Sequence, residues 1–243
     1  MKIETLSVNG FAIELPIGLE TVLDTPVRDS YQTFLKESTN DVRRHLTCLT
    51  TLLPPAVADI KQPRVLHAFG GVGASAQVLD QVAPHHEHVF WERDPVLVRY
   101  LRHCYPNETV VHAQDSMPWL ATEDLSVYDI ILLDMSVGTI KTKGVKDMWT
   151  NVAKAVKARP DIVVWFTDTA CHKIHLNHKT YAKDFGIEVD KTAESYLNAY
   201  SAWLEQVHGL TITAAMREAG EFYCVVKSNE PEDNQRFKSI PYV

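Results

Sequence analysis

Long apolar runs are missing from the sequence: no stretch approaches the roughly 18 residues that suggest a membrane-spanning helix. The segment MKIETLSVNGFAIELP alternates polar and apolar residues and lacks the continuous apolar core of a signal peptide. Cysteine is scarce: only 4 occur, and they lie far apart and form no Cys-x-x-Cys pair. Such residues usually remain thiols in a reducing compartment. We therefore expect a cytoplasmic protein without a membrane span.

Basic residues are in deficit, with 24 Lys and Arg against 31 Asp and Glu. The resulting net charge of −7 disfavours a broad nucleic-acid-binding surface. The cluster Lys141, Lys143 and Lys146, together with Arg43 and Arg44, still leaves room for a local basic patch that meets a phosphate or an acidic group. An ordinary solvated charged face is the alternative. Nothing in the sequence indicates an oligomeric state.

Internal repeats and low-complexity linkers are also missing, and 243 residues suffice for one large α/β domain. Residues 1–60 differ from the rest and predict an N-terminal extension. It begins with a hairpin that turns at Asn9-Gly10, followed by a helix from Asn40 that ends at Pro54-Pro55. The apolar stripe of this helix comprises Val42, Leu46, Leu49 and Leu53.

From residue 61 to 243, predicted strands and helices alternate, which is typical of a doubly wound, mostly parallel sheet. The predicted strands cover residues 65–69, 88–92, 109–113, 128–134 and 161–167, and a final pair covers 210–216 and 222–227. The predicted helices cover residues 74–83, 95–105, 145–158 and about 191–208, the last with Gly209 as its C-cap. Asp94 precedes Pro95, the arrangement of an N-cap followed by proline at the first helical position.

Only 10 glycines occur, yet Gly70, Gly71 and Gly73 fall together in the stretch RVLHAFGGVGASAQVLD. They join a predicted strand to a predicted helix, where glycine lets the backbone approach a ligand and adopt positive φ. Glu92 ends the next strand, 21 residues after Gly71, where a carboxylate can accept hydrogen bonds from both ribose hydroxyls. This pattern fits a nicotinamide dinucleotide or S-adenosylmethionine. A close helix–strand contact without a ligand is the third alternative.

Four segments in order then resemble the motifs of the class I, Rossmann-like S-adenosylmethionine-dependent methyltransferases: VLHAFGGVG, HVFWERD, HAQDS and YDIILLD. The C-terminal stretch LTITAAMREAGEFYCVVKS is similar to theirs as well, so the resemblance covers about residues 63–228. It implies an α/β fold with a doubly wound, seven-stranded, mostly parallel sheet and an antiparallel C-terminal strand. It also implies S-adenosylmethionine as the cofactor and methyl transfer as the activity.

The resemblance also assigns roles to single residues. Gly71 and Gly73 would border the methionine part of the cofactor, in a turn shared with Phe69 and Gly70. Glu92 would bind the ribose. The remaining cofactor-binding positions are Asp115, which would face the adenine amino group, Ser116 beside it, and Asp134 near the amino-acid end and the methyl acceptor.

The acceptor is not identified by the sequence, but some acceptors are disfavoured. The loop DMSVGTIKTKG is not the Asp/Asn-Pro-Pro-Tyr/Phe loop of amino-directed DNA methyltransferases, and no Pro-Cys pair serves cytosine C5 methylation. A small-molecule acceptor is therefore favoured over nucleic acid or protein. Asp134 and Asp168 end consecutive predicted strands, which we expect to be neighbours in the sheet, and they are the predicted catalytic pair. They could share a divalent cation, but the Asp-Asn of metal-dependent O-methyltransferases is here Asp168-Thr169, so no metal is predicted.

The stretch after Asp168 is long for a connection and is expected to cover the acceptor pocket with Tyr31 and Phe34, for which core packing is the alternative. Within it, a helix would bring Cys171, His175 and His178 onto one face, as zinc ligands or as a solvated surface. Two other functions stay open. One is an NAD(P)-dependent oxidoreductase, and the other is a non-catalytic cofactor-binding module, suggested by the unusual DMSVG loop.

Overall fold

The computed structural model describes residues 2–17, 39–82, 86–112, 116–134, 142–168, 193–218 and 221–228. Its internal contacts divide the chain into two compact units, Met1–Ser116 and Met117–Val243. In the described part of the chain, no helix has the length and apolar character needed to cross a membrane.

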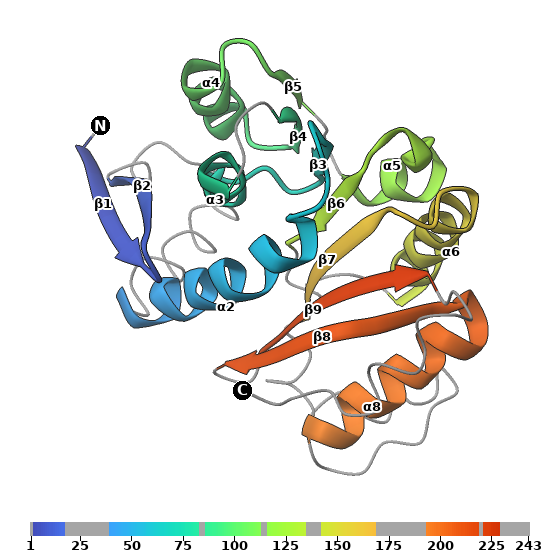
Figure 1. The fold of residues 1–243 in the computed structure, drawn as a ribbon. Helices are drawn as coiled ribbons and strands as arrows, with labels where there is room; N and C mark the ends of the chain where they lie inside the picture. Colours follow the sequence, from blue (N-terminus) through green and yellow to red (C-terminus); the bar gives the residue numbers. More distant parts are fainter. Residues whose placement is uncertain are drawn as a thin grey trace. The chain divides into compact units, whose positions relative to one another are not determined.

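The central feature is a sheet of seven strands in the order β5-β4-β3-β6-β7-β9-β8 (Figure 1). Neighbours β3 and β4, β4 and β5, and β6 and β7 are parallel, whereas β9 is antiparallel to both β7 and β8. This confirms the predicted α/β class, the strand number and the antiparallel strand near the C-terminus. The strands are β3 (Arg64–His67), β4 (Glu87–Glu92), β5 (Thr109–His112), β6 (Ile130–Leu133), β7 (Val163–Asp168), β8 (Leu210–Glu218) and β9 (Glu221–Ser228).

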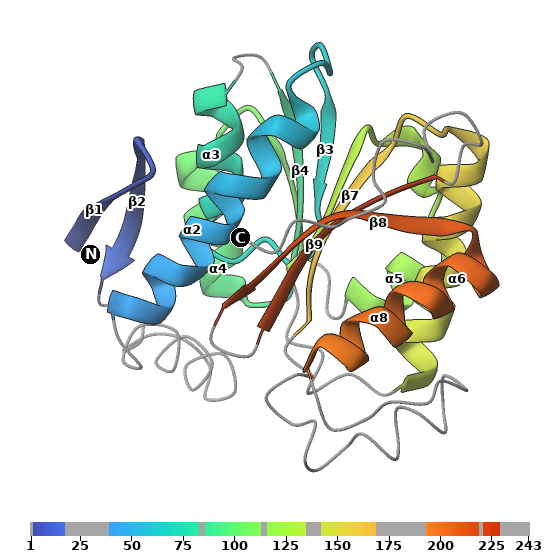
Figure 2. The ribbon, with the colours of Figure 1, turned by 60° about the horizontal axis from the view of Figure 1, so that its bottom comes forward.

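The first unit contains the N-terminal hairpin, whose strands are β1 (Lys2–Val8) and β2 (Phe11–Ile17). Asn9 and Gly10 have φ of 50° and 86°, so the predicted two-residue turn is confirmed. The hairpin lies beside α2 (Thr39–Val57) and α3 (Ala74–Val82), as Figures 1 and 2 show from two directions.

Two glutamines of α3 attach the hairpin to the unit. The Gln77 amide accepts from the Glu14 N–H at 2.7 Å and donates to the Glu14 carbonyl at 2.9 Å. The Gln81 amide does the same for Ala12, at 2.9 and 2.8 Å. One helical turn separates the glutamines and one strand repeat separates their partners, so the spacings of about 6 and 7 Å match. The two side chains thus pair the open edge of β2 as another strand would.

Helix α2 differs from its prediction in where it ends. Pro54 and Pro55 lie inside the helix, which continues to Val57. Each proline removes one backbone donor near the end of the helix, and burial of Leu53 and Val57 offsets that loss. Leu46 and Leu49 are buried as predicted, whereas the Val42 side chain lies outside the described part.

Helix α4 (Pro95–Cys104) confirms the predicted N-cap. The Asp94 carboxylate accepts from the backbone N–H groups of Val96 at 2.7 Å and Leu97 at 3.2 Å, and Pro95 occupies the first helical turn. The helix is amphipathic, and its buried Leu101 reaches the glycine turn that follows β3.

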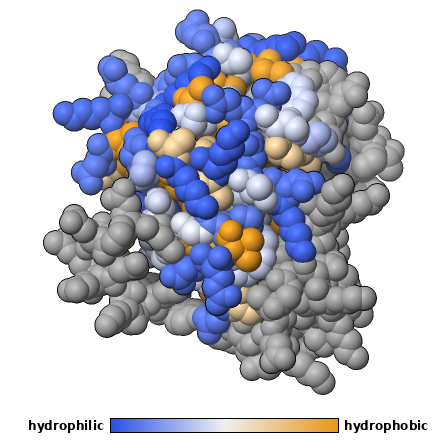
Figure 3. All heavy atoms as spheres, turned by 90° about the vertical axis from the view of Figure 1, so that its right-hand side faces the viewer, coloured by the Kyte–Doolittle hydropathy of each residue, from blue (hydrophilic) through white to orange (hydrophobic). Residues whose placement is uncertain are grey.

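The second unit packs its helices around large aromatic side chains. Trp149 of α6 (Thr142–Ala158) is fully buried and donates its indole N–H to the Tyr200 hydroxyl at 2.7 Å. Tyr200 belongs to α8 (Ala193–Trp203), which continues as a π-helical turn (Leu204–His208) and ends at Gly209 with φ of 67°, the predicted C-cap. Two short helices were not predicted, α5 (Ser116–Thr122) and the 3₁₀ turn η2 (Leu125–Val127). Among the described residues on the face shown in Figure 3, most are hydrophilic and the apolar ones form small separate groups.

Candidate functional site

The candidate site begins at the turn between β3 and α3, in the first unit. Gly70 donates its N–H to the Trp91 carbonyl at 2.9 Å, which ties the turn to β4. Gly73 donates to the Gly70 carbonyl at 3.0 Å and closes a four-residue turn. Gly71 and Gly73 have φ of 53° and 73°, a region that favours glycine.

The three glycines of this turn have different surroundings. A Cβ on Gly73 would lie 2.9 Å from the Tyr105 ring, and a Cβ on Gly70 would lie 3.0 Å from Leu101. A side chain at Gly73 would therefore displace the Tyr105 ring, and one at Gly70 would press on the end of the Leu101 side chain in α4. Among the described residues, a Cβ on Gly71 would meet nothing closer than the Phe69 carbonyl oxygen at 3.9 Å. Gly71 is thus the glycine whose open side can face a ligand.

Glu92, the last residue of β4, lies directly against this turn. Its Oε2 accepts from the Gly71 N–H at 2.7 Å. Its Oε1 accepts from the N–H groups of Arg93 at 2.7 Å and Asp94 at 2.9 Å. A carboxylate oxygen offers about two lone-pair sites, so Oε2 keeps acceptor capacity while Oε1 is saturated. The structure therefore brings Gly71 and Glu92 together and leaves one oxygen of Glu92 able to accept from a ligand hydroxyl.

Glu92 is a buried residue, only 8% exposed. Burial raises its pKa above the ordinary 4.5, although the three backbone donors oppose that shift and the nearby Asp94 adds to it. Because the pKa of Glu92 is raised in the folded protein, protonated Glu92 contributes favourably to the free energy of unfolding. This contribution is lost as the pH rises through the folded-state pKa. Ionised Glu92 therefore destabilises the fold at neutral pH. Ionisable groups with strongly perturbed pKa values, whose charge lowers the stability of the fold, are common at functional sites.

Asp94 Oδ2 is a second observation that points to a ligand here. The residue is 2% exposed, and among the described residues this oxygen has no hydrogen-bond partner. Buried carboxylate oxygens normally accept a hydrogen bond from protein, water or ligand. The open side of Gly71, the spare capacity of Glu92 Oε2 and the unpartnered Asp94 Oδ2 together fit a nucleoside that carries hydroxyl donors.

The other predicted cofactor-binding residues are placed unevenly. Phe69 is half-buried in the bend after β3, and Ser116 is buried at the start of α5. Asp115 lies outside the described residues, so its role stays a prediction. The cofactor contacts of these residues remain predictions.

The second unit contains the predicted catalytic pair. Strands β6 and β7 are neighbours, as predicted, and Leu133 pairs with Phe166. By this register, Asp134 lies level with Thr167, whose hydroxyl donates to Asp134 Oδ1 at 3.3 Å. Asp168 comes one residue further along β7, and its side chain lies outside the described part. The roles of Asp134 and Asp168 therefore stay predictions.

The predicted basic patch is described only in part. Arg43 donates to the Ser7 carbonyl at 3.4 Å, and Lys146 is half-buried on α6. Other sequence predictions lie outside the described residues: Lys141, the Lys143 side chain, the aromatics Tyr31 and Phe34, and the cluster Cys171, His175 and His178.

The structure also shows polar residues that the sequence reasoning missed. His67, on β3, contacts Ser75 Oγ through Nδ1 and His88 Nδ1 through Nε2, both at 2.9 Å. Burial, followed by the charges of His88 and His86, lowers the pKa of His67 well below 6.5, so the ring is neutral. The signals were the run HHEH, which overlaps the start of β4, and the histidine of VLHAFGG, both visible in the sequence.

Comparison with known proteins gives likeness at the level of structure. Neither a protein-family profile nor a curated protein sequence matches this chain. Trm1 from Pyrococcus horikoshii, solved with S-adenosyl-L-methionine, superposes with a TM-score of 0.59 at 12% identity over 92% of this chain and 61% of its own. The PH0226 protein of Pyrococcus horikoshii OT3 gives 0.57 at 13% identity, over 85% of this chain and 100% of its own.

A third similar structure is the plantazolicin methyltransferase BamL, solved with a triazolic desmethylPZN analog and SAH. It gives a TM-score of 0.55 at 12% identity over 87% of this chain and 94% of its own. Identities this low show the fold alone. The chain therefore has the class I methyltransferase fold that its motifs resemble.

Proposed function

We propose that this protein is an S-adenosylmethionine-dependent methyltransferase that acts on a small molecule. The observation that carries the proposal is the contact between the Gly71 N–H and Glu92 Oε2 at 2.7 Å. On the side of Gly71 where a side chain would lie, the nearest atom of the described residues is the Phe69 carbonyl oxygen at 3.9 Å. The likeness of the fold to methyltransferases solved with this cofactor or its product supports it. The cofactor supplies an activated methyl group on a sulfonium, so the protein's part is mainly alignment.

Each proposed residue then has a separate task. Glu92 accepts hydroxyl hydrogen bonds from the ribose, and Gly71 lets the backbone approach the ligand. Asp134 orients the acceptor or holds its proton, with Thr167 fixing one carboxylate oxygen. Asp168 is the proposed partner of Asp134, because the two residues end adjacent parallel strands.

A small-molecule acceptor is favoured by what the sequence lacks. The net charge of −7 opposes broad binding of nucleic acid, and the loop after β6 has none of the DNA-methyltransferase motifs. A cytoplasmic location belongs to the same proposal. It is supported by the described cysteines Cys48, Cys104 and Cys224, which carry thiols.

The rival oxidoreductase could draw on a Tyr-x-x-x-Lys spacing at Tyr223 and Lys227. Both residues lie in strand β9, where four residues span about 13 Å, too far for the two groups to act on one hydroxyl. Tyr223 is also 2% exposed and packs against Trp165 in the second unit. This pair therefore does not support hydride transfer.

Calorimetry with S-adenosylhomocysteine and with NADH tests the cofactor. We expect binding of the first and none of the second. Glu92→Ala removes a charge-assisted acceptor worth about 1.5–3 kcal/mol, so S-adenosylhomocysteine should bind roughly 10- to 150-fold more weakly. Glu4→Ala, which removes an exposed carboxylate on β1, is the matched control and should bind normally. NADH binding that depends on Glu92 would replace the proposal with the oxidoreductase.

Transfer itself is tested with labelled S-adenosylmethionine and a fractionated cell extract as the source of acceptor. Asp134→Asn keeps the shape and removes the charge, so transfer should fall more than cofactor affinity does. Asp168→Asn should do the same if the two residues act as a pair. Cofactor binding without any transfer in the wild-type protein would favour the non-catalytic module. Wild-type turnover in both variants would remove the carboxylates from the chemistry.

A further inference from the structure

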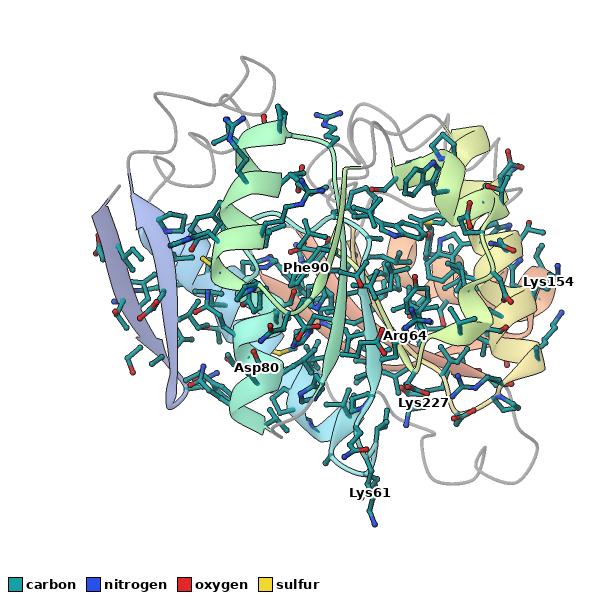
Figure 4. The ribbon with its side chains drawn as sticks, turned by 90° about the horizontal axis from the view of Figure 1, so that it is seen from above. Lys61, Arg64, Asp80, Phe90, Lys154 and Lys227 are labelled. Carbon is teal, nitrogen blue, oxygen red and sulfur yellow. The ribbon has the colours of Figure 1, made fainter. Side chains whose placement is uncertain are left out.

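A cluster of three side chains lies at the other end of β4 from the proposed cofactor site. Asp80 belongs to α3, His88 is the second residue of β4, and His86 comes just before that strand. One ligand atom from each lies within 4.8 Å of the others. His88 and Glu92 are four residues apart, or about 13 Å along the strand, so this cluster is separate from the Gly71–Glu92 contact. Figure 4 shows Asp80 on α3 and Phe90 in the sheet beside it.

The spacing of the three donor atoms suits a small cation. Asp80 Oδ1 is 2.9 Å from His88 Nε2 and 3.8 Å from His86 Nδ1. Ligands of tetrahedral zinc at about 2.0–2.1 Å from the metal are about 3.3 Å from one another. The observed separations bracket that value, so the donors could reach a shared ion with movements of less than about 1 Å.

Burial and hydrogen bonding add an independent observation. The side chain of His86 is 1% exposed, and its Nδ1 has no hydrogen-bond partner among the described residues. A buried polar atom without a partner is unusual, and this one points toward Asp80 and His88. The imidazole rings of His86 and His88 stack with centroids 5.6 Å apart, which holds both donors on one side. Asp80 is 46% exposed at its side chain and leaves a path from solvent.

The residues behind His88 resemble the support of a metal ligand. His88 Nδ1 contacts His67 Nε2, and His67 Nδ1 contacts Ser75 Oγ. In one consistent tautomer pattern, each Nδ1–H donates along this chain, which leaves the lone pair of His88 Nε2 directed toward Asp80. Metal-ligating histidines almost always donate their other N–H to such a partner. In the other pattern, His88 Nε2–H donates to Asp80, and a bound cation would take the place of that proton.

We propose that Asp80, His86 and His88 form a zinc site, in which a water molecule completes the tetrahedral coordination. Two imidazole nitrogens and one carboxylate favour Zn²⁺ over Mg²⁺ or Ca²⁺, which prefer oxygen ligands. The site joins the C-terminal half of α3 to the start of β4. Zinc binding therefore stabilises this unit of the fold and takes no part in methyl transfer.

The test is a titration of the untagged, chelator-treated protein with ZnCl₂, followed by calorimetry. We expect one zinc per chain, a higher melting temperature with Zn²⁺ than with Mg²⁺, and the visible absorption of tetrahedral cobalt when Co²⁺ replaces zinc. Asp80→Asn preserves shape and should weaken zinc binding by at least about tenfold, as should His86→Gln. Asp59→Asn and His103→Gln change exposed residues of the same unit and should bind zinc normally.

Two outcomes would overturn the proposal. One is the absence of zinc binding by a folded wild-type protein. The other is zinc binding that Asp80→Asn and His86→Gln leave unchanged, since the metal would then be held elsewhere, such as by the predicted cluster of Cys171, His175 and His178. Circular dichroism checks that each variant is folded. Binding of S-adenosylhomocysteine should be the same in Asp80→Asn as in the wild type, so the two proposals can fail independently.

Discussion

Ionised Glu92 destabilises the fold but can accept a hydrogen bond from a ligand. Burial raises its pKa, and its charge therefore opposes folding at neutral pH. The three backbone N–H groups that reach it hold the carboxylate in place without saturating Oε2. A glutamine would keep the size of the side chain but would present an N–H₂ group to Gly71 or to the ligand. A carboxylate suits this position because it only accepts hydrogen bonds. The affinity for the ligand should therefore depend on pH.

Affinity for S-adenosylhomocysteine should fall as the pH is lowered toward the raised pKa of Glu92, because a protonated carboxyl is the weaker acceptor. The decline should begin above the pH at which an ordinary glutamate, with a pKa of 4.5, becomes protonated. Calorimetry across the acidic range measures this. Glu92→Gln should bind weakly and with little pH dependence. The same decline in Glu92→Gln would assign the pH dependence to another group.

Substitution of Gly71 and Gly73 by alanine should separate binding from packing. Both residues have positive φ, which costs an alanine about 1–2 kcal/mol. Gly73→Ala also places a methyl group 2.9 Å from the Tyr105 ring, so its unfolding free energy should fall by more, about 2–4 kcal/mol in all. Gly71→Ala should lose only the backbone cost but should weaken S-adenosylhomocysteine binding. Denaturant unfolding and calorimetry measure the two effects, and equal stability losses with unchanged binding would contradict them.

At the scale of elements, the hairpin is held by side chains rather than by the main sheet. Gln77 and Gln81 each make two hydrogen bonds to β2, and β1 pairs with its other edge. This arrangement protects an edge strand that would otherwise expose unpaired backbone groups. It also fixes the hairpin, residues 2–17, to α3, directly after the glycine turn.

The double variant Gln77→Ala, Gln81→Ala removes four hydrogen bonds. Because these bonds are exposed, each contributes no more than about 1.5 kcal/mol to the stability of the fold. Hydrogen exchange should accelerate at the Ala12 and Glu14 amides, while the amides of β4 stay protected. Unchanged protection at Ala12 would mean that packing against α2 and α3 is sufficient to hold the hairpin.

The sequence predicted most elements because their periodicity and end signals are local. The Asn9-Gly10 turn, the Asp94-Pro95 helix start and the Gly209 helix end are fixed by residue chemistry and are all confirmed. The stop at Pro54-Pro55 was wrong because burial of Leu53 and Val57, a tertiary effect, outweighs the local cost of proline. Helix α5 was missed because seven residues are too few to show a helical period.

The sequence predicted the part of the candidate site that depends on the spacing of residues along the chain. It did not predict the parts that depend on contacts between separate helices and strands. Glu92 was found from its distance to Gly71 along the chain, and the structure brings the two together. The different surroundings of Gly70, Gly71 and Gly73 depend on α4 and were invisible in the sequence. The cluster of Asp80, His86 and His88 joins a helix to a strand, so only the fold reveals it.

At the scale of the whole molecule, the fold and the chemistry support one account. The fold is similar to that of BamL and Trm1, which were solved with SAH and with S-adenosyl-L-methionine. The fold alone does not specify an activity. The proposed activity rests on the Gly71–Glu92 contact and on the predicted roles of the carboxylates that end β6 and β7.

A crystal structure of the protein with S-adenosylhomocysteine tests this account most directly. We expect a ribose hydroxyl within hydrogen-bond distance of Glu92, at about 2.5–2.8 Å from Oε2, and ligand atoms in contact with the open side of Gly71. A ligand bound elsewhere, with Glu92 still held only by its three backbone donors, would contradict the assignment of the site and with it the proposed function.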